Sequence, residues 1–170
     1  MNAAYFQTLA RYNAWANRRL YAACGKLPEG VYLKERPSFF GSIHKTLNHV
    51  LAADRIWLSR FEKTGGVPKA LDALLAKDFT EMKTAREAED KRIFKFAAGL
   101  NDERVNAVFH YHDLKGALHA VPMHLCLAHF FNHQTHHRGQ VHGMLSGEEL
   151  DPPPLDIIYF ALEELEGAKT

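Results

Sequence analysis

The sequence predicts an all-α fold, a four-helix bundle built from four long amphipathic helices. Three observations predict it. Apolar residues recur at alternating spacings of three and four in long segments, glycine or proline follows each segment, and no internal repeat or low-complexity tract interrupts the pattern. With 170 residues, 46% of them hydrophobic, the chain is long enough for one sizeable core. We therefore expect a single domain over residues 1–170.

The first two helices are predicted over residues 3–24 and from residue 38 or 42 to about residue 61. Gly25 and Pro28 end the first, and Ser38 or Ser42 can cap the second. The repeating positions of the second helix are Ile43, Leu47, Val50, Asp54, Trp57 and Phe61. We interpret the aromatic residues of these helices, Tyr12, Trp15 and Trp57, as packing residues.

A third helix is predicted to begin at Asp78, which precedes Glu81 by three residues, the spacing of a capping box. Its apolar positions are Phe79, Met82, Ile93 and Phe96. The charges from Glu81 to Arg92 are interpreted as a solvated face, supported by pairs such as Arg86 with Asp90.

Between residues 101 and 121 the period changes from helical to alternating, and the segment Asp113–Gly116 offers a turn. We expect a short hairpin there. Pro122 suits the first turn of a long fourth helix that extends to about Ser146. After a break at residues 151–154, a short last helix is predicted around Leu155, Ile158, Leu162 and Leu165.

Composition excludes several function classes. Lys and Arg number 21 against 20 acidic residues, and no basic run forms a stripe for a phosphate backbone, so nucleic-acid binding has no support. No segment approaches the ~20 apolar residues of a membrane helix, and no leader pattern begins the chain. Two cysteines without a CxxC pairing fit a reducing compartment. We expect a soluble cytoplasmic protein without a membrane partner.

Histidine carries the strongest chemical signal, because nine of the 11 histidines lie between residues 110 and 142. His133 and His137 are four residues apart in the predicted fourth helix, so both rings lie on one face and can point toward one ion. Two imidazoles bind a metal weakly. A third ligand must come from another helix, and His49 is the candidate we choose.

Several neighbours remain open alternatives. His44 is the rival of His49 on the second helix. His129 and His136 border the face of the pair, so either can replace a ligand or orient one. Gln140 and Asp54 are candidates for orienting a ligand ring by hydrogen bonds. Cys126 lies on the same face, and we interpret it as a small buried residue rather than a catalytic thiol.

At this point the chain resembles the DinB family of DinB/YfiT-like proteins along nearly its whole length. The segment Tyr12–Leu20 resembles the family's first helix, and Ser42–Trp57 resembles its second, with the histidine at His49. His133–Gln140 resembles the signature HxxxHRGQ, and Asp151-Pro152-Pro153 before Asp156 also fits. The resemblance implies a four-helix bundle, commonly a homodimer, with a divalent metal on His49, His133 and His137.

Three imidazoles leave a coordination position for water or substrate, which is typical of catalytic zinc. Nitrogen ligands suit zinc or nickel, with iron and copper as further candidates. Some relatives in the family use low-molecular-weight thiols, so our leading hypothesis is a metal-dependent thiol transferase acting on an unknown small-molecule substrate. The alternatives are a hydrolase that uses metal-activated water and a non-catalytic metal-binding protein of the stress response.

Overall fold

The computed structural model describes residues 1–148 and 150–168. Four long helices and five shorter elements follow one another along the chain. They are α1 (Ala3–Cys24), α2 (Glu29–Leu33), α3 (Ile43–Glu62), α4 (Phe79–Ala98), α5 (Asp102–Asn106), β1 (Val108–His112), β2 (Leu118–Pro122), α6 (Met123–Ser146) and α7 (Ile157–Gly167).

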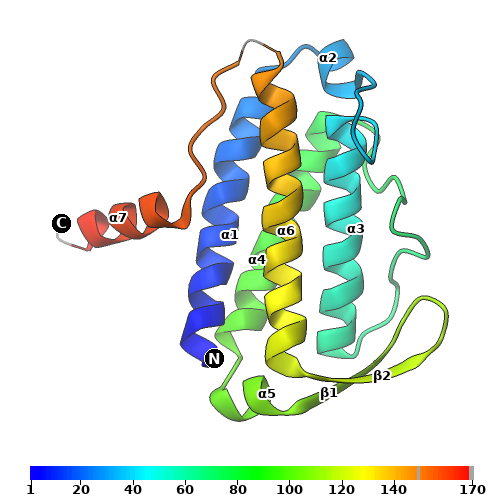
Figure 1. The fold of residues 1–170 in the computed structure, drawn as a ribbon, viewed down its shortest axis with the longest axis vertical. Coiled ribbons are helices and arrows are strands. Elements are labelled where there is room, and N and C mark those ends of the chain that lie inside the picture. Colours follow the sequence, from blue (N-terminus) through cyan, green and yellow to red (C-terminus); the bar gives the residue numbers. More distant parts are fainter. Residues whose placement is uncertain (149, 169–170) are drawn as a thin grey trace.

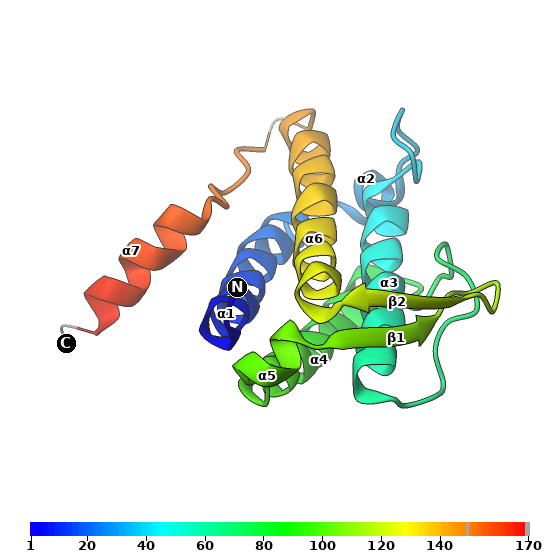
Figure 2. The ribbon, with the colours of Figure 1, turned by 60° about the horizontal axis from the view of Figure 1, so that its bottom comes forward.

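The four long helices form a bundle, as the sequence predicts (Figure 1). Helix α1 packs against α4 and α6, and α3 packs against the same two helices, so the four lie at the corners of a square. The hairpin β1–β2 crosses the end of the bundle near the last turn of α3, and α7 lies outside the four-helix bundle, where its buried Phe160 packs on α1 (Figure 2). No helix among residues 1–148 and 150–168 is long and apolar enough to cross a membrane.

Local capping explains where the helices begin. The Ser42 side chain accepts a hydrogen bond from the Lys45 amide, so Ser42, not Ser38, caps α3. Asp78 accepts from the Glu81 amide and caps α4, as the capping-box spacing predicts. Pro122 ends β2 and immediately precedes α6, where its missing N–H costs the helix nothing.

The predicted hairpin is present, with Val108 opposite Pro122 and His112 opposite Leu118. Its turn contains Gly116 at φ +86°, a conformation that favours glycine. The sequence did not predict the five-residue helices α2 and α5, which are too short to show a period. Helix α7 begins at Ile157, two residues after the predicted Leu155.

The interpretation of the third helix's charges as a solvated face holds for Glu81, Lys83, Glu87 and Lys91, which are exposed, and the predicted pair of Arg86 with Asp90 is present, but the interpretation is wrong for three buried residues. Arg86 is 2% exposed, and Glu89 and Asp90 are also buried. The Arg86 guanidinium lies 2.5 Å from the Asp54 carboxylate of α3 and 2.9 Å from that of Asp90. Buried charges persist when opposite charges and hydrogen bonds compensate them. The sequence pattern of α4 alone does not reveal that Arg86 pairs with Asp54, because Asp54 belongs to α3.

This polar layer crosses the bundle between two apolar clusters. Asn13 and Asn17 of α1 donate to Asp90, and the Arg138 guanidinium of α6 donates to Asn13. On the hairpin side the core contains Phe6, Leu58, Phe61, Ile93, Phe96, Leu127 and Phe130. On the other side it contains Leu20, Leu47, Leu51, Met82, Val141 and Leu145. The layer joins all four long helices and so holds α3 and α6 in a defined relative position.

Candidate metal site

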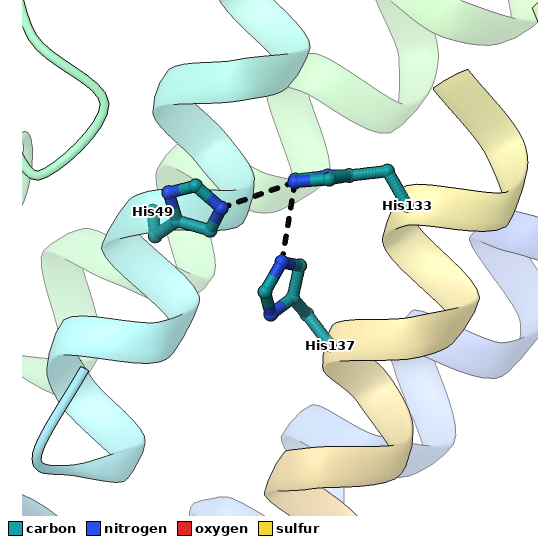
Figure 3. A group of neighbouring side chains, drawn as sticks. All are labelled: His49, His133 and His137. Carbon is teal, nitrogen blue, oxygen red and sulfur yellow. Dashed lines mark hydrogen bonds between the residues drawn. The ribbon is translucent and has the colours of Figure 1, made fainter. Parts of the chain in front are cut away.

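Three imidazole rings converge between α3 and α6. His49 comes from α3, and His133 and His137 come from successive turns of α6 (Figure 3). The i, i+4 spacing on one helix places the second and third rings above one another, as the sequence predicts. His49 and His137 are buried, and His133 is half-buried. One ligand nitrogen from each ring lies within 4.8 Å of the other two.

The spacing of these nitrogens fits one metal ion. The Nε2 atoms of His49 and His133 are 3.1 Å apart, and those of His137 and His133 are 3.2 Å apart. Two imidazole nitrogens bound tetrahedrally at 2.0–2.1 Å from zinc are about 3.3 Å apart. The rings therefore need little movement to bind an ion.

The hydrogen bonds on the opposite side of two rings determine which nitrogen carries the proton. The Nδ1 of His49 lies 2.9 Å from the Leu71 carbonyl, which only accepts, so Nδ1 donates. The Nδ1 of His137 lies 2.8 Å from Oε1 of Gln140 and donates in the same way. In a neutral ring the Nε2 atom then carries a lone pair. Both lone pairs point toward Nε2 of His133, so a cation placed among the three rings would be bound by both.

The electrostatic environment keeps the three rings neutral. Burial, together with the neighbouring imidazoles, lowers the pKa of His133 to about 3. Burial lowers the pKa of His137 to about 4, although the hydrogen bond to Gln140 opposes the shift. Burial also lowers the pKa of His49. A metal ion therefore meets unprotonated ligands at neutral pH.

The other candidates from the sequence lie at different distances from the triad. Gln140 contacts His137 directly, and its Nε2 donates to Nε2 of His136 at 3.1 Å. The His129 ring centre is 5.7 Å from that of His133, without a hydrogen bond between them. The Asp54 carboxylate pairs with a guanidinium of α4 instead of a ligand ring. The His136 ring also lies edge-on to that of His137, with centres 4.8 Å apart. Gln140 and His136 are thus the candidates that the structure places in contact with a ring of the triad, and Gln140 does so by a hydrogen bond.

The rival histidine of α3 and the cysteine of α6 lie outside the site. Nδ1 of His44 lies 3.2 Å from the Tyr32 hydroxyl, in the space between α2 and α3. Cys126 is 3% exposed and belongs to the apolar cluster on the hairpin side.

Phe40 is a site residue that the sequence pattern did not single out. Its ring stacks on the His49 ring with centres 4.0 Å apart, and its edge faces His137 at 5.6 Å. The loop before α3 carries it there. The neighbouring Phe39 is exposed, and its ring lies edge-on to that of Phe40 with centres 4.9 Å apart. The sequence signal for Phe40 is therefore only the presence of two adjacent aromatic residues shortly before the helix of His49.

The donor set leaves part of a coordination sphere free. Within residues 1–148 and 150–168, the group of ligand atoms comprises His49, His133 and His137 and no fourth His, Cys, Asp or Glu. Closed structural zinc sites have four protein donors, whereas catalytic sites have three and a free position. The residues present fit a nitrogen-bound divalent ion whose coordination sphere the protein does not complete.

Comparisons with known proteins agree with this architecture. The model of the DinB family matches residues 1–164. Protein DinB of Bacillus subtilis (strain 168) is 30% identical over 168 residues, covering 94% of this chain and 96% of its own. The crystal structure of a DinB-like protein from Bacillus cereus ATCC 10987 has a TM-score of 0.68 at 15% identity, with 90% of this chain and 97% of that chain covered. The chain belongs to the DinB family.

Proposed function

We propose that the protein binds one divalent metal ion on His49, His133 and His137 and acts as a metal-dependent thiol transferase. The observation that carries the proposal is the convergence of three neutral imidazoles with no fourth protein donor among the described residues. Zinc and nickel are the ions we expect, with iron as the alternative. A divalent ion at such a position lowers the pKa of a bound thiol and so supplies a thiolate at neutral pH.

The nucleophilic thiol comes from a small molecule, because neither cysteine of the chain is suited to the role. Cys24 is buried, and desolvation raises the pKa of its thiol to about 12. Burial also raises the pKa of Cys126. Nucleophilic cysteines need a lowered pKa and access to the substrate. These two unpaired thiols also support the expected cytoplasmic location.

The residues around the triad have separable tasks. The Leu71 carbonyl and the Gln140 side chain fix the orientation of two ligand rings. The stacked ring of Phe40 covers one side of His49 and keeps water from that face. A substrate therefore approaches from the side that is free of Phe40.

Metal content and thiol consumption test the proposal together. Untagged protein is loaded with zinc or nickel and incubated with several cellular thiols and a chromogenic haloarene electrophile. The single variants His49→Ala, His133→Ala and His137→Ala are compared with His142→Ala, which changes another histidine of the same helix. We expect one ion per chain and metal-dependent loss of thiol in the wild type and in His142→Ala only.

The alternatives give different results. Product formation without thiol consumption identifies metal-activated water as the nucleophile and contradicts the transferase. Bound metal without turnover of any thiol contradicts enzymatic activity. Loss of metal in fewer than three of the triad variants, with the helical circular dichroism signal retained, contradicts the ligand set.

We also propose a homodimer, as the family resemblance implies. Helix α7 supports it, because Ile158, Leu162 and Leu165 are 49–61% exposed on one stripe of an 11-residue helix. A second copy of the chain would cover this stripe. Sedimentation that shows only monomer at micromolar concentration would contradict the dimer.

A further inference from the structure

Next to the triad lies a row of aromatic and basic side chains that contact one another. Its members are Trp57 and Arg60 of α3, Tyr111 of β1, His119 of β2 and His129 of α6; we call this set the aromatic strip. All five are exposed or half-buried. The hairpin contributes two of them, because Tyr111 and His119 are cross-strand partners on one face and stack with ring centres 5.2 Å apart.

The strip is continuous with the candidate metal ligands. The His129 ring centre is 5.7 Å from that of His133 and 5.2 Å from that of Trp57, and Trp57 is 5.1 Å from Tyr111. On α3, Trp57 and Arg60 follow His49 by eight and eleven residues, on the same side of the helix. At 1.5 Å per residue, the Cα atoms of His49 and Arg60 are about 16 Å apart.

Among the described residues, Arg60 forms no ion pair, although the Asp113 carboxylate acts on it at longer range, in the direction that raises its pKa. Its guanidinium lies 4.9 Å from the Trp57 ring centre and 5.0 Å from that of Tyr111. Among residues 1–148 and 150–168, no carboxylate forms an ion pair with it. Desolvation by the rings around it is the main reason that the pKa of Arg60 is lowered. Its burial therefore carries a cost that an anion would offset.

The carboxylate that acts on Arg60, that of Asp113, already has hydrogen-bond partners of its own. Asp113, in the hairpin turn, accepts hydrogen bonds from the Lys115 and Ala117 amides at Oδ1, and its Oδ2 lies 3.0 Å from Nε2 of His119. Arg19 of α1 is a useful comparison, because it lies over a tryptophan ring as Arg60 does but has an acidic partner. Arg19 also covers a tryptophan ring, Trp15, but is paired with Glu163.

We propose that the aromatic strip binds the substrate of the metal site, and that this substrate carries a carboxylate or phosphate group bound by Arg60. The inference rests on the proposed function for the reacting end of the molecule. Between the metal and Arg60, the exposed His129 ring and the half-buried Trp57 ring fit a planar apolar segment, whereas the Tyr111 ring stacks on Phe109 and His119. The substrate class is thus an elongated organic anion. This assignment changes the interpretation of Trp57 from a packing residue to a binding residue.

Binding to metal-free protein tests the strip without requiring the metal or turnover. The probes are 4-phenylbutyrate, its neutral amide and phenylpropyl phosphate, at constant ionic strength. The indole N–H signals of a ¹⁵N-labelled sample report the two tryptophans separately, and the variant Trp15→Phe assigns them. We expect both anions to shift the Trp57 signal and leave the Trp15 signal unchanged.

The decisive comparison is between the anions and the amide. In the wild type we expect the anions to bind roughly tenfold more tightly than the amide, because a charge-assisted hydrogen bond is lost with the amide. Arg60→Gln and Arg60→Met should remove this preference, and the matched control Arg19→Gln should retain it. The anion that binds more tightly identifies the group as carboxylate or phosphate.

Two results would overturn the assignment. One is an anion preference that persists in Arg60→Gln and Arg60→Met. The other is a Trp57 signal that no probe moves at millimolar concentration. Failure of the proposed function would appear differently, as missing metal or missing turnover in protein whose strip still prefers anions.

Discussion

Protonation of His133 and His137 should leave metal binding nearly independent of pH between 7 and 5, and the lowered pKa of His49 acts in the same direction. Protons compete with a metal for each imidazole, and the competition begins when the pH falls to the pKa of the ring. A ring with the ordinary pKa of 6.5 loses about 25-fold in metal affinity between these two values, and two rings lose roughly 600-fold. With pKa values of about 3 and about 4, His133 and His137 remain neutral at pH 5. Their combined loss is about 1.1-fold.

Equilibrium dialysis against buffered zinc, followed by elemental analysis, measures the affinity at each pH. The sign follows from the direction of the shifts: lowered pKa values keep the lone pairs available in acid, so release begins only as the pH approaches 4. A loss of several hundredfold with a midpoint near pH 6.5 would refute the reasoning. It would mean that the rings are solvated and separate in the metal-free protein, rather than buried and convergent.

Three further predictions follow from the site and the polar layer. Gln140→Leu should weaken metal binding by about 10- to 100-fold, because the His137 ring loses the acceptor that orients it. Equilibrium dialysis measures this affinity, and an unchanged value would contradict the role of the hydrogen bond between Gln140 and His137. Arg86→Met should lower the free energy of unfolding by about 3–5 kcal/mol, because two buried carboxylates lose their cation. Urea denaturation measures this free energy. The control variant Lys91→Met, at an exposed position of the same helix, should stay within about 0.5 kcal/mol of the wild type. Removing the ion from protein at a hundredfold excess over Kd should cost about 2.7 kcal/mol and lower the Tm by about 5–10 °C in a thermal scan.

The sequence predicted the long helices and the pair on α6 because both depend on local spacing. The helical period places His133 and His137 on one face whatever the neighbouring elements do. The same holds for the cap of α4 at Asp78 and for the hairpin before α6. The choice between Ser38 and Ser42 was open, because both can cap a helix and the start of α3 depends on the preceding loop.

Features that depend on packing between elements were missed or misinterpreted. The burial of Arg86 requires Asp54 of α3, which lies 32 residues earlier. The contact of Phe40 with His49 requires the loop before α3 to fold back over the His49 ring. The environment of Arg60 requires the hairpin to dock on α3, where Tyr111 meets it. Each of these contacts joins residues whose relative position no single helical or strand period determines.

X-ray absorption spectroscopy of the zinc-loaded protein tests the central claim most directly. The account predicts one ion per chain, three imidazole nitrogens at about 2.0–2.1 Å, and a remaining light-atom ligand that an added thiol replaces with sulfur at about 2.3 Å. A shell of four protein donors that the thiol leaves unchanged would contradict the open site. So would a protein that binds no ion.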